Sequence, residues 1–192
     1  MPKLSHTFTP VLFALAATGA FAGENDAQMQ AFLEASVLPW AQDAAILDAV
    51  AAQNAKTGGY DQATIDQLDT TWRGEVGDPG SALISSVIGN AASDFLRQQV
   101  AATGGQITEI IVMDAKGLNV AASGVTSDYW QGDEAKHSDT FGVGAGAVHY
   151  GEIEFDESSQ TYQAQISFTL VDPATGAPVG AMTVAVDGAA LL

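Results

Sequence analysis

The chain contains no cysteine, so it has no means of forming a disulfide, a thiolate metal site or a cysteine nucleophile. Basic residues are nearly as scarce, because six Lys and Arg stand against 23 Asp and Glu and give a formal net charge of −17. Affinity for nucleic acid depends on neutralising phosphates, so this charge argues against a nucleic-acid partner and disfavours anionic membrane surfaces. The acidity favours either solubility, for instance in a saline habitat, or attraction of a cationic ligand or partner.

Long apolar runs are also missing, and the one short run lies near the N-terminus. It spans Val11–Ala17, follows Lys3 and precedes the small-x-small sequence Ala20-Phe21-Ala22. This pattern predicts a secretory signal peptide over residues 1–22, cleaved after Ala22. The alternative is an uncleaved anchor, although the run is well short of the roughly 20 residues that a spanning helix needs. We expect a mature domain over residues 23–192 in a bacterial periplasm, with no membrane insertion after cleavage.

Helical periodicity dominates the first half of the mature chain. Apolar residues three and four apart predict a long helix over 27–55, with a kink or short break near Pro39, because proline removes a backbone donor. Asp61 is the predicted N-cap of a second helix over 62–73. A third helix is predicted over 81–100, and Gly104-Gly105 ends this half.

From Ile107 the period changes to that of β-strands. Strands are predicted at 107–113, 118–122, 147–155, 161–171 and 179–186. Residues 161–171 alternate strictly, so the apolar even positions and the polar odd positions face opposite sides of the sheet. Helices followed by strands with short turns predict an α+β fold, in which a five-stranded antiparallel sheet carries a long N-terminal helix and further helices.

The densest chemistry lies between the second and third predicted strands, in residues 126–136. A ligand pocket needs apolar or aromatic walls and a few placed polar groups. Tyr129 and Trp130 supply walls that also suit a cation or a planar group. The polar groups are three acceptors and one nearby cation, namely Asp128, Gln131, Asp133 and Lys136.

The alternative for this stretch is structural. Tyr129 and Trp130 would plug the loop onto the sheet, and the charges would cap a short helix, with Asp128 as its N-cap and Lys136 near its end. The two interpretations are compatible, because one aromatic ring is able to anchor the loop while the other lines a pocket.

Three residues outside the stretch complete the predicted ligand site. Gln165 lies on the polar face of the strand over 161–171, and Tyr150 comes from a neighbouring strand. Arg73 is a scarce cation beside Trp72 and is suited to hold a carboxylate, with an ordinary surface arginine as the alternative.

Patterns for catalysis or metal binding are weak. No G-x-S-x-G occurs, His137 and His149 are the only histidines beyond the leader, and no phosphate-binding glycine loop is present. Asp128, Asp133 and Glu134 offer oxygens to a hard cation, but their spacing fits no calcium loop and a solvated turn is the alternative. We therefore predict no catalytic residue, no metal ligand and no cofactor.

Several segments together resemble the single Cache domains, also called PDC or extracytoplasmic PAS-like sensor domains. They are residues 65–73, 108–114, 116–121, 126–136 and 180–184. The resemblance implies a five-stranded antiparallel PAS-like sheet with a long N-terminal helix on one face and a ligand pocket on the other. The loop and short helix after the second strand would roof that pocket, where small organic acids, amino acids or amines bind in relatives.

The resemblance also frames the expected function. Most such domains sit between two membrane spans and are joined to a kinase, a cyclase or a chemotaxis signalling domain, and no such output domain is recognisable in this sequence. We expect a ligand-binding sensory module, not an enzyme, that reports occupancy to a membrane sensor or transporter. The alternatives are an interaction or assembly protein with a vestigial pocket, and a carboxylate-based hydrolase.

Overall fold

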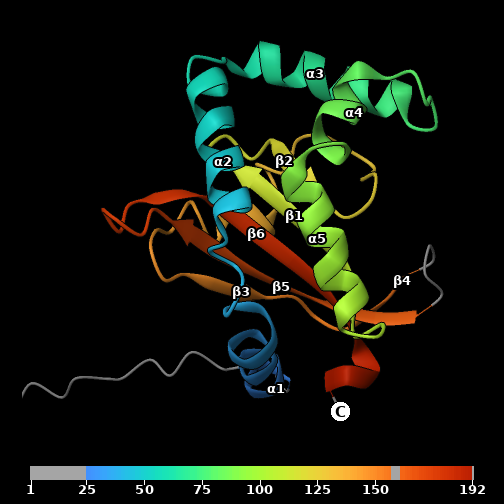
Figure 1. Ribbon diagram of the computed structural model, residues 1–192, viewed down its shortest axis with the longest axis vertical. Helices are drawn as coiled ribbons and strands as arrows, with labels where there is room; N and C mark the ends of the chain where they lie inside the picture. The colour runs from blue at the N-terminus through green and yellow to red at the C-terminus, as the bar shows by residue number, and fades with distance from the viewer. Residues whose placement is uncertain (1–24, 157–160, 192) are drawn as a thin grey trace, which may run out of the picture.

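An antiparallel sheet with helices over one face forms the frame of the molecule (Figure 1). The structure is a computed structural model that describes residues 25–156 and 161–191. The predicted signal peptide and its cleavage site lie outside the described residues. The described chain begins with the helices and continues with the strands, which is the order predicted from the sequence.

The sheet has the order β2-β1-β6-β5-β3, with β4 also paired to β5. All of these pairs are antiparallel. The strands are β1 (Ile107–Asp114), β2 (Asn119–Ala122), β3 (Val148–Tyr150), β4 (Glu154–Asp156), β5 (Thr161–Val171) and β6 (Pro178–Asp187). The predicted antiparallel sheet is therefore confirmed.

The outer strand on the β5 side is interrupted, where the sequence predicts one strand over 147–155. β3 pairs with the middle of β5 and β4 with its start, as Tyr150 opposite Ile166 and Glu154 opposite Gln163 show. Between them, the N–H of Gly151 donates to the carbonyl of Gln165 at 2.8 Å. The prediction of one continuous strand is wrong, but its two parts share one position at the sheet edge.

The predicted long N-terminal helix is present and broken near Pro39. α1 (Asp26–Phe32) continues into a π-helical turn (Leu33–Val37), and α2 (Ala44–Thr57) begins after a short loop. Proline cannot donate a backbone hydrogen bond, which accounts for the break. The side chain of Asp43 caps the new start by accepting from the N–H of Ala45 at 2.8 Å.

The second predicted helix is α3 (Gln62–Glu75), and Asp61 caps it as predicted by accepting from the N–H of Thr64 at 2.9 Å. The third is wrong as a single helix, because α4 (Ala82–Ile88) ends at Gly89 and α5 (Ala91–Ala102) starts anew. The side chain of Asn90 caps α5 by accepting from the N–H of Ser93 at 2.9 Å. Gly89 and Asn90 are a stop signal followed by a start signal, which explains the split.

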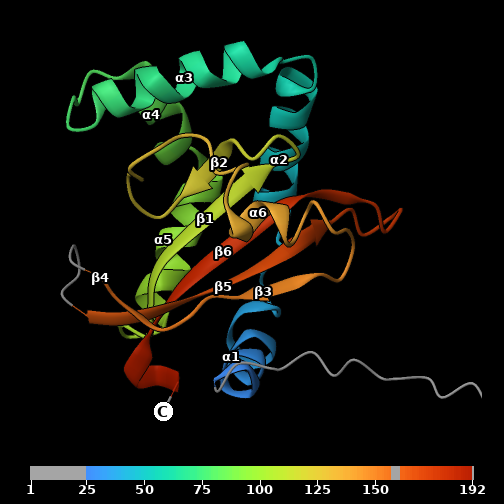
Figure 2. The same ribbon diagram turned by 180° about the vertical axis from the view of Figure 1, so that it is seen from behind.

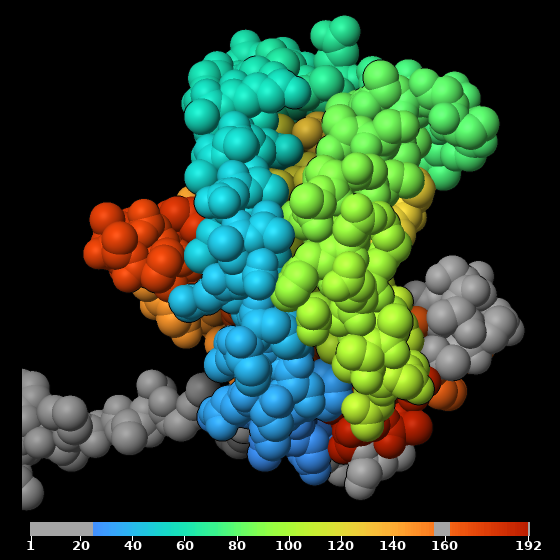
Figure 3. Space-filling model, in the orientation of Figure 1, coloured from blue at the N-terminus to red at the C-terminus, as the bar shows by residue number. Residues whose placement is uncertain are grey.

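Helices α2 and α5 cover one face of the sheet side by side (Figures 1 and 3). The main core lies between these helices and the sheet, and includes Val50, Leu96, Ile110, Ile166 and Val184. The even-numbered residues of β5 from Ala164 to Leu170 face this core, as the alternation predicts. α3 runs across one end of the molecule, above β2 (Figure 1).

The opposite face of the sheet is only partly covered (Figure 2). Here α6 (Ala135–Ser138) and the loop after it lie over a small apolar cluster of Ile111, Met113, Ala181 and Phe141. The chain closes with a 3-10 helix (Gly188–Leu191). Within residues 25–156 and 161–191, no helix has both the length and the apolar character needed to cross a membrane.

Candidate functional site

Residues 129–131 pair antiparallel with residues 117–119, where the chain enters β2, and residues 126–128 precede this short pairing. Trp130 forms an antiparallel bridge with Leu118. The N–H of Asn119 donates to the carbonyl of Tyr129 at 2.9 Å, and the N–H of Gln131 donates to the carbonyl of Gly117 at 2.8 Å. The backbone of this segment is therefore fixed to the sheet edge.

Tyr129 holds the segment against α3. Its ring stacks on Trp72, with centroids 5.4 Å apart and an interplanar angle of 17°, and both side chains are buried. The indole N–H of Trp72 donates to the carbonyl of Thr126 at 2.9 Å. Burial raises the pKa of the Tyr129 hydroxyl well above its usual value. The ring is an internal anchor in this arrangement.

Asp69 and Arg73 of α3 fasten the same segment by polar contacts. One carboxylate oxygen of Asp69 accepts from the N–H groups of Tyr129 and Trp130, at 2.9 and 3.1 Å. The other oxygen lies 2.8 Å from Nε of Arg73, and Nη2 of Arg73 lies 3.7 Å from the carboxylate of Asp128. The charge of Arg73 is thus met by two carboxylates of the protein itself.

The remaining polar residues of the stretch also bond to one another. The side-chain amide of Gln131, which is buried, donates to the carboxylate of Asp128 at 2.5 Å. The ammonium of Lys136 donates to Oε1 of Gln131 at 3.1 Å and lies 3.0 Å from the carboxylate of Glu134. Asp133 is exposed.

The predicted N-cap role of Asp128 is wrong. The residue before α6 is Glu134, which makes no side-chain capping bond. The carboxylate of Asp128 instead accepts from Gln131, because the chain between them follows the edge of β2 before α6 begins.

The turn between β1 and β2 connects this segment to the helical face. One carboxylate oxygen of the buried Asp114 accepts from the N–H groups of Lys116 and Leu118, at 2.8 and 3.0 Å. The other accepts from the hydroxyl of Thr57 at 2.7 Å and the amide of Gln53 at 3.2 Å, both on α2. A single carboxylate therefore shapes the turn and ties it to α2.

The same turn also meets α6 from the opposite face. Nε2 of His137 lies 3.2 Å from the carbonyl oxygen of Asp114, and its ring stacks on Phe141 with centroids 5.2 Å apart. Burial lowers the pKa of His137, although the carbonyl and the carboxylate of Asp114 act in the opposite direction. Asp114 thus stands between α2 and α6.

Strand register places polar residues together on the uncovered part of the sheet. Glu109 of β1 pairs with Ala185 of β6, and Ala185 pairs with Gln165 of β5. Gln163 lies two residues from Gln165 on the same face and pairs with Glu154 of β4. Side chains two residues apart on a strand share a face, so these residues form one polar floor.

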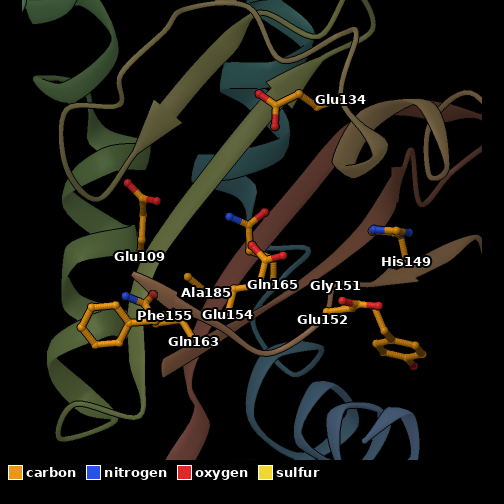
Figure 4. Close-up of a pocket in the computed structure, with 11 residues that line it drawn as sticks. Glu109, Glu134, His149, Gly151, Glu152, Glu154, Phe155, Gln163, Gln165 and Ala185 are labelled. Atoms are coloured by element: carbon orange, nitrogen blue, oxygen red, sulfur yellow. The ribbon is translucent and has the colours of Figure 1, made fainter. Parts of the chain in front are cut away.

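A cavity of about 630 Å³ lies over this floor (Figure 4). We call it the open-face cavity. Glu134, from the N-terminus of α6, and His149, of β3, stand around the floor in Figure 4. Among the described residues, the cavity is lined by Glu109, Glu134, His149, Tyr150, Gly151, Glu152, Glu154, Phe155, Gln163, Gln165 and Ala185.

Two of the nine predicted ligand-binding residues line the open-face cavity. Gln165 is part of its floor. Tyr150 lines it too, although its ring packs against the main core and its pKa is raised by burial and by the carboxylates of Asp26 and Glu34. The other seven, which the structure gathers mainly at the β2 edge, are Arg73, Asp128, Tyr129, Trp130, Gln131, Asp133 and Lys136.

The residues that sequence reasoning did not select are mostly carboxylates. Glu109 stands alone in an apolar strand, and that position was a usable signal, because a single acid on one face of a buried strand calls for an exposed or functional site. Glu134 belongs to the stretch that drew attention but was considered only as a cation ligand. Glu154 has no such signal, since only the break at Gly151 brings it beside Gln163.

The carboxylates around the cavity are dispersed. Among the described residues, no three His, Asp or Glu side chains are grouped closely enough to hold a metal ion. The arrangement is suited to bind an extended polar molecule over a polar floor.

No protein-family model matches the chain, and no curated protein sequence matches it. Similar folds are found among solved structures at low sequence identity. The sensor domain of the Vibrio cholerae histidine kinase DctB is 14% identical, with a TM-score of 0.41, over 88% of this chain and 56% of that one. The sensory domain of the Campylobacter jejuni chemoreceptor Tlp3 is 9% identical, with a TM-score of 0.43, over 87% of this chain and 65% of that one.

A third similar structure is the ligand-binding domain of the Pseudomonas fluorescens chemoreceptor CtaA, in complex with L-alanine. It is 15% identical, with a TM-score of 0.40, over 74% of this chain and 57% of that one. The chain thus spans less than two thirds of the length of these solved chains. The first two are sensor domains by description, and the third is a chemoreceptor ligand-binding domain.

Proposed function

We propose that this protein is a reversible small-molecule-binding sensory module and that the open-face cavity is its ligand site. The observation that carries the proposal is the cavity itself: about 630 Å³ over a floor of amides and carboxylates. This volume falls within the range of about 300–1,000 Å³ that is typical of small-molecule pockets. Its place on the sheet face opposite α2 is also where the resemblance to Cache domains implies a pocket.

Within this proposal the predicted residues divide into two groups. Gln165 and Tyr150 contact the ligand from the cavity lining. Six of the seven residues at the β2 edge act as positioning residues, because their contacts hold the segment that leads into Glu134. The seventh, Asp133, is exposed beside that segment. Arg73 and Lys136 belong to this second group, since each is already paired with a carboxylate of the protein.

Ligand occupancy has a physical route to the helical face. Glu134 immediately precedes α6, His137 of α6 lies against the carbonyl oxygen of Asp114, and the Asp114 carboxylate accepts from the hydroxyl of Thr57 on α2. A ligand that contacts Glu134 and the sheet together favours one position of α6 over others, and differential affinity of this kind is what a sensor needs. We propose that a membrane sensor or transporter reads the outcome.

A thermal-shift screen with amino acids, amines and short carboxylates tests the proposal. We expect at least one compound to raise the unfolding temperature of the protein, because a ligand that binds only the folded state stabilises it. The variant Ala185→Leu, which places a larger side chain in the cavity floor, should lose that shift. Ala63→Leu, on the exposed surface of α3, is the matched control and should retain it.

Two results would argue against ligand sensing. If no compound raises the unfolding temperature, the result favours the alternative of an interaction or assembly protein. If a bound compound is converted into another, as mass spectrometry would detect, the hydrolase alternative returns.

The predicted signal peptide over residues 1–22 is tested separately from the ligand site. We propose that residues 1–22 direct export to the periplasm and are removed after Ala22. Expression of the full chain in a Gram-negative host, followed by N-terminal sequencing of the periplasmic protein, should give Gly23 as the first residue. An intact Met1 on the exported protein would favour the uncleaved anchor.

A further inference from the structure

We infer that the outer face of α2 is a docking surface for a second copy of this chain, with the two α2 helices packed antiparallel across a two-fold axis near Ala52. The inference goes beyond the proposed function and does not depend on it, because α2 covers the sheet face opposite the open-face cavity. A groove beside α2, the charge of the helical face and the spacing of two unpaired charges support it.

The groove runs between α2 and the region where α4 meets α5 (Figure 3). Its volume is about 570 Å³, and it reaches the sheet at Val120. On the α2 side, Ala45, Ala49 and Ala52 lie three and four residues apart and so share one face of the helix. The distance between packed helices depends on the side chains at the contact, so these alanines allow another helix to approach closely.

The outward side of α2 is also poor in charge. Six residues of this helix are exposed, and four of them are alanines, namely Ala44, Ala51, Ala52 and Ala55. The solvent-facing side of a surface helix normally carries charged and polar residues. The side of α2 that faces away from the sheet therefore differs from an ordinary solvated helix face.

The helical face has no net charge in a strongly acidic protein. Apart from the cap residue Asp43, α2 contains Asp48 and Lys56, α5 contains Asp94 and Arg97, and α4 contains no charged residue. The whole chain has a formal net charge of −17. A net charge of this size keeps copies of a protein apart by repulsion. Two copies therefore meet less repulsion at these helices than elsewhere on their surfaces.

Asp48 and Lys56 are the two charged residues that line the groove. Both are exposed, and among the residues that the structure describes neither has an ion-pair partner. They lie four residues on either side of Ala52. A two-fold axis at Ala52 that sets the helices antiparallel brings Asp48 of each copy to Lys56 of the other, so one contact forms twice. The charges of this face are complementary to those of a second copy.

The same spacing suits helix packing. Residues four apart form ridges on a helix, and ridges of this kind on two helices interlock at a crossing angle of about 50°. Asp48, Ala52 and Lys56 form one such ridge, with its small residue at the centre and its charges at the ends. A parallel pair would instead bring the two Asp48 carboxylates together, and like charges repel. The charges therefore favour the antiparallel arrangement.

Sedimentation velocity of the purified protein from about 1 to 200 µM tests the inference, because a dimer forms by mass action. At about 0.15 M salt, repulsion between distant charges is screened, whereas charges in contact still interact. We expect an equilibrium between monomer and dimer that depends on concentration. A protein that stays monomeric over the whole range would overturn the inference.

Charge variants identify the surface and the orientation. Asp48→Lys and Lys56→Asp each turn both ion pairs of the dimer into repelling pairs, so each should raise the dimer dissociation constant by about tenfold or more. The two substitutions combined in one chain restore both pairs and should restore the dimer. Asp66→Lys, on the exposed side of α3, changes the net charge as Asp48→Lys does and should leave dimerisation unchanged.

A single introduced thiol locates the two-fold axis. The chain has no cysteine, so Ala52→Cys adds one thiol to each copy, and at the axis the two thiols lie close enough to form a disulfide. Mild oxidation should convert this variant into a covalent dimer on a non-reducing gel. Ala63→Cys, exposed on α3, is the matched control and should stay largely monomeric. Circular dichroism confirms that each variant is folded.

Three further results would contradict the inference. A dimer that both single charge variants leave intact would show that the copies associate through another surface. A double variant that stays as weak as the single variants would rule out the antiparallel pairing of Asp48 with Lys56. Equal cross-linking of Ala52→Cys and Ala63→Cys would place no axis at α2. None of these results decides ligand binding at the open-face cavity, which the thermal-shift screen tests.

Discussion

The ring of Tyr129 lies flat against the indole of Trp72, with centroids 5.4 Å apart and both side chains buried. Two residues far apart in the chain thus lock the segment over 126–131 onto α3. The stretch with the densest chemistry in the sequence is anchored by one of its two aromatic rings. The stacked pair leads to a stability prediction.

Tyr129→Ala should lower the free energy of unfolding by about 3–5 kcal/mol, because it removes a buried aromatic ring and leaves a cavity against Trp72. Tyr129→Phe keeps the stacked ring and should cost far less. Urea unfolding followed by tryptophan fluorescence measures both. Equal losses in the two variants would mean that the hydroxyl, and not the ring, holds the segment.

Asp69→Ala should lower the free energy of unfolding by about 2–4 kcal/mol, because the N–H groups of Tyr129 and Trp130 both lose their acceptor. Hydrogen exchange at these two amides should become faster in the variant. Asp66→Ala on the same helix removes only an exposed contact with Gln62 and should stay within about 0.5 kcal/mol. Unchanged hydrogen exchange at residues 129 and 130 would show that the Asp69 carboxylate does not protect these amides.

Gly117→Ala tests the close approach of two backbones at the β1–β2 turn. Gly117 has a φ of 80°, and an added Cβ would lie 2.5 Å from Cα of Gly132. Gly104 also has a positive φ, of 62°, but an added Cβ would meet nothing within 4 Å. Gly117→Ala should therefore lower the free energy of unfolding by about 1–3 kcal/mol more than Gly104→Ala does, as measured by denaturant unfolding. Similar losses would show that backbone conformation alone sets the cost.

His137 should make the protein less stable at mildly acidic pH. Burial holds its pKa in the folded state below the ordinary value of 6.5. As pH falls below about 6.5, the unfolded chain gains a proton on this ring that the folded chain does not, so stability decreases until the folded pKa is reached. Free energies of unfolding at about pH 7 and pH 5.5 measure the difference.

Two histidine variants attribute that pH effect. In His137→Gln the decrease between the two pH values should be smaller than in the parent protein. In His149→Gln, where the exchanged ring lies at the cavity, the decrease should persist. A full decrease in His137→Gln would assign the effect to other groups.

Much of the fold could be predicted from the sequence because its signals are local. Pro39 breaks a helix wherever it stands in one, Asp61 caps the next helix, and strict alternation over 161–171 assigns two faces to β5. The split between α4 and α5 was missed because an apolar pattern continues through Gly89. The cap at Asn90 becomes visible only from its bond to Ser93.

The sheet face that carries the open-face cavity could be predicted, but most of the residues that line the cavity could not. Glu109 and Glu154 are distant in sequence, and strand register alone brings them to either side of Gln163 and Gln165. The stretch over 126–136 attracted attention through its residue types, yet most of its polar groups satisfy one another. Composition reveals where polar residues are concentrated along the chain, whereas pairing between strands decides which polar residues meet at the cavity.

The interruption of the outer strand at Gly151 has a consequence for solubility. A sheet edge is a template for pairing with another chain, and proteins avoid this with short, charged or covered edges. Here β2 is only four residues long and residues 129–131 pair at its start, while the opposite edge consists of the short strands β3 and β4 with Glu152 and Glu154 nearby. Among the described residues, neither edge offers a long, uncharged strand, so the carboxylates at the cavity also protect the protein against edge-to-edge aggregation.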